Sequence, residues 1–515
     1  MIEAIKISNI DRAKNAMVAA LGSDAVLTTD EQVKEFRDPY EGAGATDFQP
    51  SFVVQPTTVE EVQEIVRIAR DVGVPIWTSS TGRNYGYGGS APVVSGSIVL
   101  NFRRMNKVLE INEEAGYALV EPGVRFFDLY DAIKAQGAKL MMSCPDIGWG
   151  SLVGNALDHG YGYTEMGDHS EAVCGMEVVL ASGEVLRTGL GAVTKSPMWQ
   201  RRKRGFGPQL DNLFMQSNYG IVTKMGRWLS PQPEVIATGS LICDTDDGIV
   251  AMIDALRPLM LDGTIQGRPL ITSSPEPKDG RAKPGEDTIG ASKQKKISAA
   301  YPPGRWNARI SFYGHESMVN AREVIVRKAF ERLPNVTMEI RKYPGNVDRK
   351  DVNPLDLVAA GIPNMFLLDE LYKHFGLSVG HVCYSPSIPF TGKDAQRHER
   401  VIQEIQRDLG LVGGFGWIAD ARCLQGVSMI MYDVDNKEEI LSSHEAVRRM
   451  LEKGAELGWT EYRAHPSLIE AVASHFDFGD HSLFKVYGKI KDALDPAGIL
   501  SPGNHGIWPS DQHWQ

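Results

Sequence analysis

The amino-acid sequence predicts an α+β protein of two domains, and three features of its 515 residues support this class. A strand, a helix and a second strand precede a glycine-rich loop at Thr81–Pro92. From Pro231 to about Trp459, strands alternate with amphipathic helices, as in an antiparallel sheet with helices on one face. The Pro/Gly-rich end of the chain is unsuited to folding alone. We therefore expect a first domain at 1–230, a second at 231–459, and a return to the first at 460–515.

The N-terminal part contains helices and short strands in alternation. A helical segment runs to about Phe36, and a β-like run follows at Ser51–Gln55. The next helix ends at Gly73, a residue suited to a left-handed stop. Its start fits a capping box in either of two registers, Thr57 with Glu60 or Thr58 with Glu61. An extended run at Val74–Thr78 then leads into the glycine-rich loop.

The loop at Thr81–Pro92 has the composition of an anion-binding turn. Glycine has no Cβ, so backbone N–H groups at Gly82, Gly86 and Gly88 can turn inward and approach a phosphate. Glycine content alone fits an ordinary surface turn equally well. No GxGxxG links a strand to a helix, which excludes a dinucleotide fingerprint of the Rossmann type.

A second glycine-rich stretch lies at Cys144–His169 and contains six glycines. We expect its backbone to press against something flat or phosphorylated instead of forming a packed helix. Further elements surround it: strands at Ser97–Asn101 and Ala118–Glu121, a helix at Phe127–Gln136, and a hairpin of Met176–Leu180 with Glu184–Thr188.

The second predicted domain has four candidate helices and four candidate strands. The helices are Asp247–Met260, Ser317–Leu333, Ala395–Leu409 and Lys437–Leu457. The strands are Ala308–Tyr313, Val336–Lys342, Gly414–Ala419 and Val427–Tyr432. The polar segment Ser273–Lys296, rich in Pro, Gly and Lys, predicts an exposed loop.

Composition excludes several classes of function. The formal net charge of −11 argues against a nucleic-acid surface. No apolar run approaches the ~20 residues that span a bilayer, and the N-terminus lacks the apolar core of an export signal. The five cysteines are odd in number and widely spaced, which indicates reduced thiols and no metal site. We therefore expect a cytoplasmic protein without a membrane or nucleic-acid partner.

The residues that could carry chemistry are scattered singly. Asp146 lies in the second glycine stretch, where a carboxylate can equally cap a turn. His381 starts a β-like run, and a lone histidine is more often structural than catalytic. The run Glu461–His465 contains Tyr462 and Arg463, which could bind an anionic oxygen or form a solvated, salt-bridged helix start. No GxSxG, HExxH or Walker loop supports a hydrolase, zinc protease or NTPase.

Eight segments together resemble the vanillyl-alcohol oxidase/p-cresol methylhydroxylase flavoprotein family. They are PTTVEEVQEIV, TGRNYGYGGSAP, CPDIGWGSLVGNALDHGYGYTEMGDH, GMEVVLASGEVLRTG, NYGIVTKMG, GHVCYSP, EYRAH and DPAGILSPGNHGIWP. Their order and combination are far more specific than any one of them. The subgroup that the chain is most similar to is the bacterial 4-alkylphenol and eugenol oxidases. The resemblance implies the two-domain FAD-binding fold of the p-cresol methylhydroxylase type, with an α+β cap domain over the flavin.

The resemblance also implies where FAD binds. His381 matches the histidine that these oxidases bond to the flavin 8α carbon. The tyrosyl-linked branch uses a tyrosine further upstream, and Tyr372 lies near that place without aligning well. The other implied cofactor-binding positions are Thr81, Gly82, Arg83, Asn84, Gly86, Gly154, Asn155, Ile221 and Asn504.

For the substrate, the resemblance implies oxidation of para-substituted phenols. These are 4-alkylphenols such as 4-ethylphenol, with eugenol and vanillyl alcohol as further candidates. Tyr87, Tyr462 and Arg463 match the trio that binds the phenol as phenolate, so that a hydride leaves the para-carbon for flavin N5 and a p-quinone methide results. Asp146 matches the base for water that adds to it; proton loss gives an alkene instead. The implied pocket residues are Tyr161, Glu370, Cys383 and Ser385.

The electron acceptor implied for the oxidase subgroup is O2, which is reduced to H2O2. The alternative is a flavocytochrome-type 4-alkylphenol dehydrogenase (methylhydroxylase) that passes electrons to a cytochrome c. The family resemblance also implies a homodimer or a higher homo-oligomer.

The chain departs from the family pattern at three places. A Met-His-His run that relatives often carry reads Cys423-Leu424-Gln425 here. Asn504 stands where relatives carry Lys or Arg, which removes a positive charge near the flavin. Tyr161 and Cys383 are larger than the side chains that guaiacol-oxidising relatives place beside the ring. A crowded ring edge predicts a preference for phenols without an ortho-methoxy group.

Overall fold

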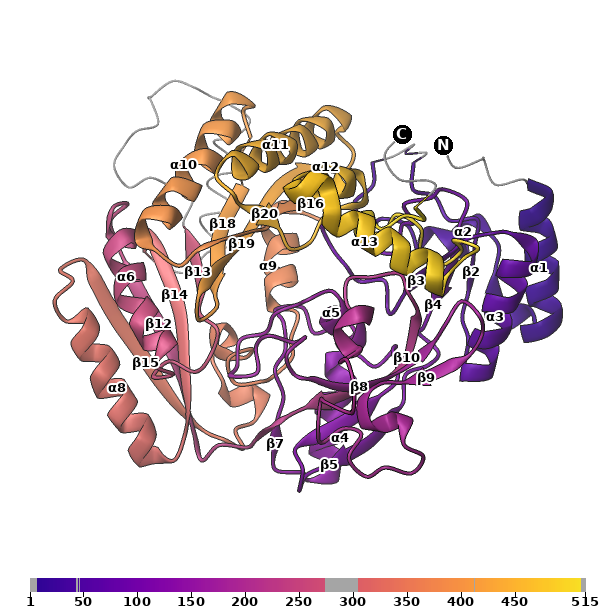
Figure 1. Cartoon of the computed structure of the whole chain (residues 1–515). Helices are drawn as coiled ribbons and strands as arrows, with labels where there is room; N and C mark the ends of the chain where they lie inside the picture. The colour runs from indigo at the N-terminus through magenta and orange to yellow at the C-terminus, as the bar shows by residue number, and fades with distance from the viewer. Residues whose placement is uncertain (1–6, 43–44, 46, 274–303, 412, 511–515) are drawn as a thin grey trace.

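The computed structural model describes residues 7–42, 45, 47–273, 304–411 and 413–510. Figure 1 shows the N-terminal elements in indigo and magenta on one side and the pink and orange segments on the other. The yellow C-terminal helix α13 returns across to the N-terminal elements. The elements of the described residues form an α+β architecture with three main sheets, in the fold class that the sequence predicts.

A four-stranded sheet begins the chain. Its strands, in the order β1-β2-β4-β3, are β1 (Val26–Leu27), β2 (Phe52–Val54), β4 (Ile98–Asn101) and β3 (Ile76–Ser79). Its helices are α1 (Ile7–Leu21), α2 (Asp30–Lys34) and α3 (Val59–Val72). A continuous helical segment to Phe36 is wrong, because Gly22 ends α1 and β1 pairs with β2.

Helix α3 forms where it was predicted. Thr58 is its N-cap and accepts a hydrogen bond from Glu61 N at 3.2 Å, which selects the second of the two registers. Gly73 ends the helix with φ 72°. The strand after it, β3, delivers the chain to the glycine-rich loop.

A five-stranded antiparallel sheet follows, in the order β5-β6-β10-β8-β9. Its strands are β5 (Val108–Asn112), β6 (Tyr117–Val120), β8 (Val173–Val179), β9 (Val185–Arg187) and β10 (Ile221–Trp228). Helices α4 (Phe126–Gln136) and α5 (Leu152–Leu157) lie between β6 and β8 in the chain. A small ladder pairs β7 (Leu140–Met141) with β11 (Ser230–Pro231).

Helix α5 corrects the expectation that the second glycine stretch contains no packed helix. Ser151 caps it by accepting a hydrogen bond from Gly154 N at 3.1 Å. A Cβ at Gly154 would overlap the Ser80 hydroxyl, so glycine is required there for contact with the first loop. The glycine therefore lets the backbone of α5 approach the Ser80 side chain closely.

Within the described residues, a nine-stranded antiparallel sheet forms the second half of the chain. Its strands are β12 (Val235–Cys243), β13 (Leu270–Ser273), β14 (Trp306–Gly314), β15 (Val336–Pro344), β16 (Val379–Tyr384), β17 (Pro386–Pro389), β18 (Gly413–Ala419), β19 (Cys423–Asp433) and β20 (Thr460–Glu461). The helices here are α6 (Gly248–Leu261), α8 (Glu316–Phe330), α9 (Phe366–Phe375), α10 (Gly392–Asp408) and α11 (Lys437–Glu456).

Helices α8, α6, α10 and α11 pack in series against one another and against the large sheet (Figure 1). They bury an apolar core around Trp306 and Trp417, both fully buried. All four predicted helices and all four predicted strands of this part are present. Strands β12, β13 and β17 and helix α9 were not predicted. Ser273 is buried at the end of β13, so the predicted loop starts later; the rest of Ser273–Lys296 lies outside the described residues.

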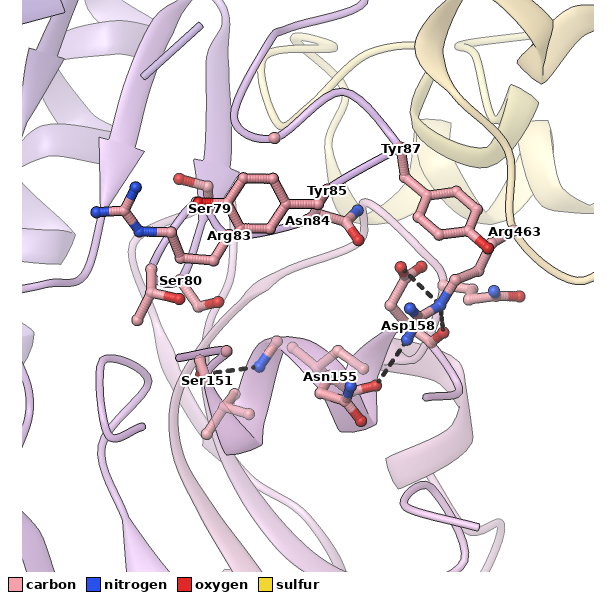
Figure 2. A pocket seen from close by; sticks show the side chains of 18 of the residues that line it. Ser79, Ser80, Arg83, Asn84, Tyr85, Tyr87, Ser151, Asn155, Asp158 and Arg463 are labelled. Carbon is pink, nitrogen blue, oxygen red and sulfur yellow. Dashed lines mark hydrogen bonds and ion pairs between the residues drawn. The ribbon is translucent and has the colours of Figure 1, made fainter. Parts of the chain in front are cut away.

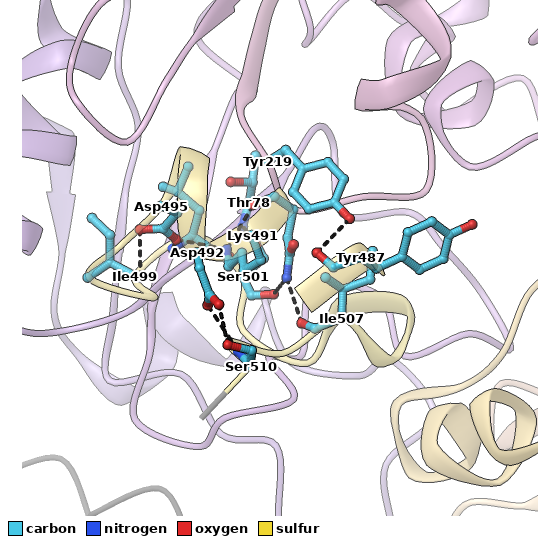
Figure 3. A network of polar contacts seen from close by, with 12 residues as sticks. Thr78, Tyr219, Tyr487, Lys491, Asp492, Asp495, Ile499, Ser501, Ile507 and Ser510 are labelled. Carbon is cyan, nitrogen blue, oxygen red and sulfur yellow. Dashed lines mark hydrogen bonds and ion pairs between the residues drawn. The ribbon is translucent and has the colours of Figure 1, made fainter. Parts of the chain in front are cut away.

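Ile499 and Leu500 of the C-terminal segment pack in the core under the first sheet. The helices of this segment are α12 (Ile469–Ser474) and α13 (Phe478–Leu494), and Leu500 forms a parallel bridge with Ile76 of β3. Figure 3 shows the fully buried Lys491, which pairs with Asp495 at 2.7 Å. Its ammonium also donates to the carbonyls of Leu500 at 2.6 Å and Asn218 at 2.9 Å. One buried cation thus joins the tail to the segment before β10.

Among the helices of the described residues, none combines the length and the apolar character that crossing a bilayer requires.

Candidate active site

A cavity of about 410 Å³ lies between the glycine-rich loop, α5, the large sheet and the C-terminal tail. Figure 2 shows its two ends. We call the wall formed by residues 79–84 the loop end. We call the wall formed by Tyr87, Tyr462 and Arg463 the arginine end. All of these residues line the same cavity.

The loop end is a backbone surface. Gly82 in this end, and Gly86, Gly88 and Gly89 in the loop that continues from it, all have φ between 59° and 90°, the left-handed region that favours glycine. A Cβ at Gly82 would overlap the Ser90 hydroxyl. Predicted residues Thr81, Gly82, Arg83 and Asn84 line this end, and Gly154 and Asn155 of α5 face them across the cavity.

His381 lies beside the loop. It belongs to β16, where it pairs with Met431 of β19, and its ring packs 4.8 Å from that of Tyr40. A Cβ at Gly86 would lie 2.6 Å from His381 Nε2, so the loop backbone touches the imidazole. Burial lowers the pKa of His381 to about 4, which keeps the ring neutral at pH 7.

The arginine end brings together three aromatic and cationic side chains that the sequence analysis had grouped. The Arg463 guanidinium lies 5.3 Å from the ring centre of Tyr462 and 5.7 Å from that of Tyr87. Burial raises the pKa of both phenols, so both remain protonated and can donate hydrogen bonds. Arg463 opposes this rise in each case.

Asp158 holds the other face of Arg463 (Figure 2). Arg463 Nε donates to the Asp158 carbonyl at 2.6 Å and lies 3.0 Å from its carboxylate. Burial alone would raise the pKa of Asp158, but Arg463 and then His505 hold it below its usual range. Gly160 gives Arg463 room, because a Cβ there would lie 2.5 Å from Nη2.

Ser385 orients Tyr87 from behind. The two hydroxyls are 2.7 Å apart, and either can donate. The Ser385 amide donates to the Glu461 carboxylate at 2.6 Å, and Gln425 donates to the Ser385 carbonyl at 2.6 Å. Burial raises the pKa of Glu461 well above its usual range, and the hydrogen bond from the Ser385 amide opposes this rise. Ser385 is absent from the cavity lining formed by the described residues.

Asp146 lines the cavity but is already engaged. Its carboxylate accepts a hydrogen bond from Tyr163 and lies 3.5 Å from Arg309 Nη2. The Arg309 guanidinium also lies 4.2 Å from the Tyr163 ring centre. Asp146 is therefore a fixed acceptor, with one oxygen on a phenol and the other near a cation.

The remaining predicted residues divide into two groups. Tyr161, Cys383 and Asn504 line the cavity, and the Tyr161 ring meets Tyr462 edge to face at 5.9 Å. Burial raises the pKa of Cys383 to about 12. In the described part of the chain the lining does not include Gly86, Ile221 or Glu370. Glu370 lies on α9 with its carboxylate bound by Lys373.

Several cavity residues were missed by the sequence analysis. Asp158 and His505 form an ion pair beside Arg463. Gln216 donates from its amide to the Tyr462 carbonyl at 2.5 Å. None has a local sequence signal, since each gains its role from a partner far away in the chain.

Comparisons with known proteins match this architecture. Two family models match the chain, a FAD binding domain over residues 50–189 and the C-terminal domain of FAD linked oxidases over residues 367–505. The 4-cresol dehydrogenase (hydroxylating) flavoprotein subunit of Pseudomonas putida is 34% identical over 519 residues, which cover 96% of this chain and 95% of that one.

Two solved structures superpose over nearly the whole chain. The 4-ethylphenol oxidase from Gulosibacter chungangensis, in an isoeugenol complex, has a TM-score of 0.91 and 32% identity and covers 99% of both chains. A p-cresol methylhydroxylase with substrate bound has a TM-score of 0.87 and 33% identity and covers 98% of both. With this fold and these matches over its full length, the chain belongs to the vanillyl-alcohol oxidase/p-cresol methylhydroxylase family of FAD-dependent oxidoreductases.

Proposed function

We propose that this flavoenzyme oxidises para-substituted phenols, with 4-alkylphenols such as 4-ethylphenol as its main substrates. The observation that carries the proposal is the convergence of Tyr87, Tyr462 and Arg463 on one end of the cavity. Two phenol donors and a guanidinium suit a phenolic oxygen that becomes an anion. Relatives named for 4-cresol and 4-ethylphenol add support.

The cavity fits FAD at its loop end. Gly82, Gly89 and Gly154 line the cavity without a side chain, so backbone N–H groups can approach a pyrophosphate closely. Thr81, Gly82, Arg83, Asn84, Gly154, Asn155 and Asn504 would hold the cofactor, with Gly86 and Ile221 supporting from the adjacent backbone. FAD supplies, when bound, an acceptor for the hydride that leaves the para-carbon.

The arginine end prepares the substrate for that loss. Tyr87 and Tyr462 donate hydrogen bonds to the phenolic oxygen, and Arg463 stabilises its negative charge. The phenolate then pushes electrons through the ring toward the para-carbon. The oxidised substrate is a p-quinone methide, which accepts water or loses a proton to give an alkene.

Asp146 is the proposed base for the water that adds to the quinone methide. Its carboxylate is held by Tyr163 and Arg309 and faces the cavity. Tyr161 and Cys383 lie at the same cavity and are proposed to crowd the ring edge. Ser385 is proposed to act through Tyr87, and the role of Glu370 as a pocket residue remains a prediction.

We also propose that FAD is bonded through its 8α carbon to His381. The neutral imidazole has a lone pair to form the bond, and the ring lines the cavity. Tyr372, the alternative, lies on α9 and packs against the cluster of Leu371, Val379 and Met431. Denatured protein from His381→Ala should lose its flavin, while a variant at Tyr372 should keep it.

For the electron acceptor we propose O2, with H2O2 as product. A cytochrome-linked dehydrogenase is the second candidate, favoured by the similarity to the 4-cresol dehydrogenase flavoprotein subunit. The domain limits 1–230, 231–459 and 460–515, a homodimer or larger homo-oligomer, and a cytoplasmic location are further proposals.

Turnover of a panel of para-alkylphenols and their methyl ethers tests the function. We expect phenols to be oxidised and the ethers to be inert, since an ether cannot become a phenolate. Assays with O2 and then with a dye acceptor separate an oxidase from a dehydrogenase. Equal rates on phenols and ethers would refute phenolate binding.

A further inference from the structure

The charges at the arginine end do not by themselves favour an added anion. The positive charge of Arg463 already faces the carboxylate of Asp158, 3.0 Å from Nε. Arg463 is 10% exposed at its side chain and Asp158 20%, so the pair is shielded from water. A phenolate placed there would add a buried negative charge to a neutral pair, which is costly.

His505 can offset the negative charge of the phenolate by becoming protonated. Its Nε2 lies 3.3 Å from the second oxygen of Asp158. It comes from the tail helix η7 (Asn504–Gly506), so Asp158 sits between a cation and an imidazole from different parts of the chain. With Nε2–H directed to Asp158, the Nδ1 lone pair can accept a proton.

His505 also has a route for proton exchange. It lines the main cavity and a second cavity of about 320 Å³. Tyr462 and Arg463 form part of the wall between the two. The second cavity reaches residues of α13 such as Leu483, which is 40% exposed.

Other titratable groups of the described residues lie on the elements next to His505, and His159 is near His505 itself. His159 follows Asp158 and also lies close to Arg463, and burial lowers the pKa of that histidine. On α12, Glu470 accepts a hydrogen bond from Trp508 at 2.7 Å. On α13, Lys491 is paired with Asp495.

We propose that His505 takes up the proton that the phenol loses on binding. The phenolic O–H bond breaks, both electrons stay on oxygen, and the proton ends on the imidazole. The phenolate and the imidazolium then add no net charge to the Arg463–Asp158 pair. This step rests on the proposed function, because it presupposes a phenolate at the arginine end.

The test uses 4-chlorophenol, which carries no hydrogen on a para-carbon substituent and is not oxidised. Calorimetric titration of the flavin-loaded enzyme, in two buffers of different ionisation enthalpy at about pH 8, counts the protons released. An ultraviolet difference spectrum reports whether the bound ligand is phenolate. We expect 4-chlorophenol to bind as its phenolate, with almost no proton released to the buffer.

Two substitutions sharpen the test. His505→Gln should weaken phenolate binding about tenfold to a hundredfold, the range for losing a charged partner, and the phenol's proton should go to the buffer. In an Asp158→Asn background Arg463 keeps its backbone acceptors but faces no carboxylate from Asp158, so its positive charge can balance the phenolate directly. There, adding His505→Gln should change affinity little.

His315→Gln is the matched control, because that histidine is exposed and pairs with Glu234. Unchanged flavin content and unfolding temperature will verify that each variant folds. Release of one proton by the parent enzyme, or equal weakening by His505→Gln in both backgrounds, would overturn the proposal. A parent enzyme that binds 4-chlorophenol undissociated would instead contradict the proposed function, and the inference with it.

Discussion

The loop end and the arginine end of the cavity are built in different ways. The loop end is backbone from one short stretch, residues 79–84, braced by α5. The arginine end is made of side chains from four separated segments, represented by Tyr87, Asp158, Arg463 and His505. A surface for a cofactor can therefore come from one short stretch of backbone. A surface that must balance the charge of a substrate needs side chains that lie far apart in the sequence.

The glycine-rich loop should be more sensitive than the arginine end to one added methyl group. Gly86→Ala places a Cβ 2.6 Å from His381 in a residue with φ 78°, so we expect no covalent flavin and no measurable activity. Gly137→Ala is the control, with φ 68° and no atom within 4 Å, and should cost only about 1 kcal/mol. Flavin fluorescence on a denaturing gel measures the outcome. Equal flavin content in both variants would break the comparison.

Asp146 tests whether cavity side chains act in chemistry as well as in binding. Asp146→Asn keeps the shape but cannot take a proton from water, so hydroxylated product should fall about 10²–10⁴-fold. Alkene should gain share, because its formation needs no water. Product ratios from 4-ethylphenol measure this. An Asp146→Asn enzyme with the rates and products of the parent would contradict the assignment of Asp146 as the base.

Arg463 carries the charge of the other end. Arg463→Ala leaves Asp158 buried without its cation. We expect transition-state stabilisation to fall by about 3 kcal/mol or more, which is a loss of over a hundredfold in kcat/KM. Tyr87→Phe removes one hydrogen bond and should cost about tenfold to a hundredfold. If Arg463→Ala proved milder than Tyr87→Phe, the charge argument for this end would fail.

The ring edge should give the smallest effect. Tyr161 and Cys383 line the cavity, so 4-ethylphenol should be preferred over 4-ethylguaiacol by about tenfold in kcat/KM. Smaller residues at either position should narrow the gap. A parent enzyme that prefers the methoxylated ring would contradict this part of the model of the pocket.

What the sequence could predict follows the same division. Helix α3, with its Thr58 cap and Gly73 stop, is encoded locally, and so is the glycine loop. Tyr462 and Arg463 were found because they are adjacent in the chain and resemble a family motif. Asp158 and His505 were not, because an ion pair between residues hundreds of positions apart exists only after folding. The short helix α5 was not predicted because the glycines in and around it are typical of irregular backbone.

The buried Lys491 has a consequence for the order of events during synthesis. Residues that emerge first from the ribosome include the glycine loop and α5, and N-terminal parts generally fold first. His505 and the segment that Lys491 holds against β3 are made last. The loop surface can therefore exist on a nascent chain while the opposite wall is still missing. A ribosome-bound chain arrested before Lys491 should take up FAD weakly and fail to bind a phenol.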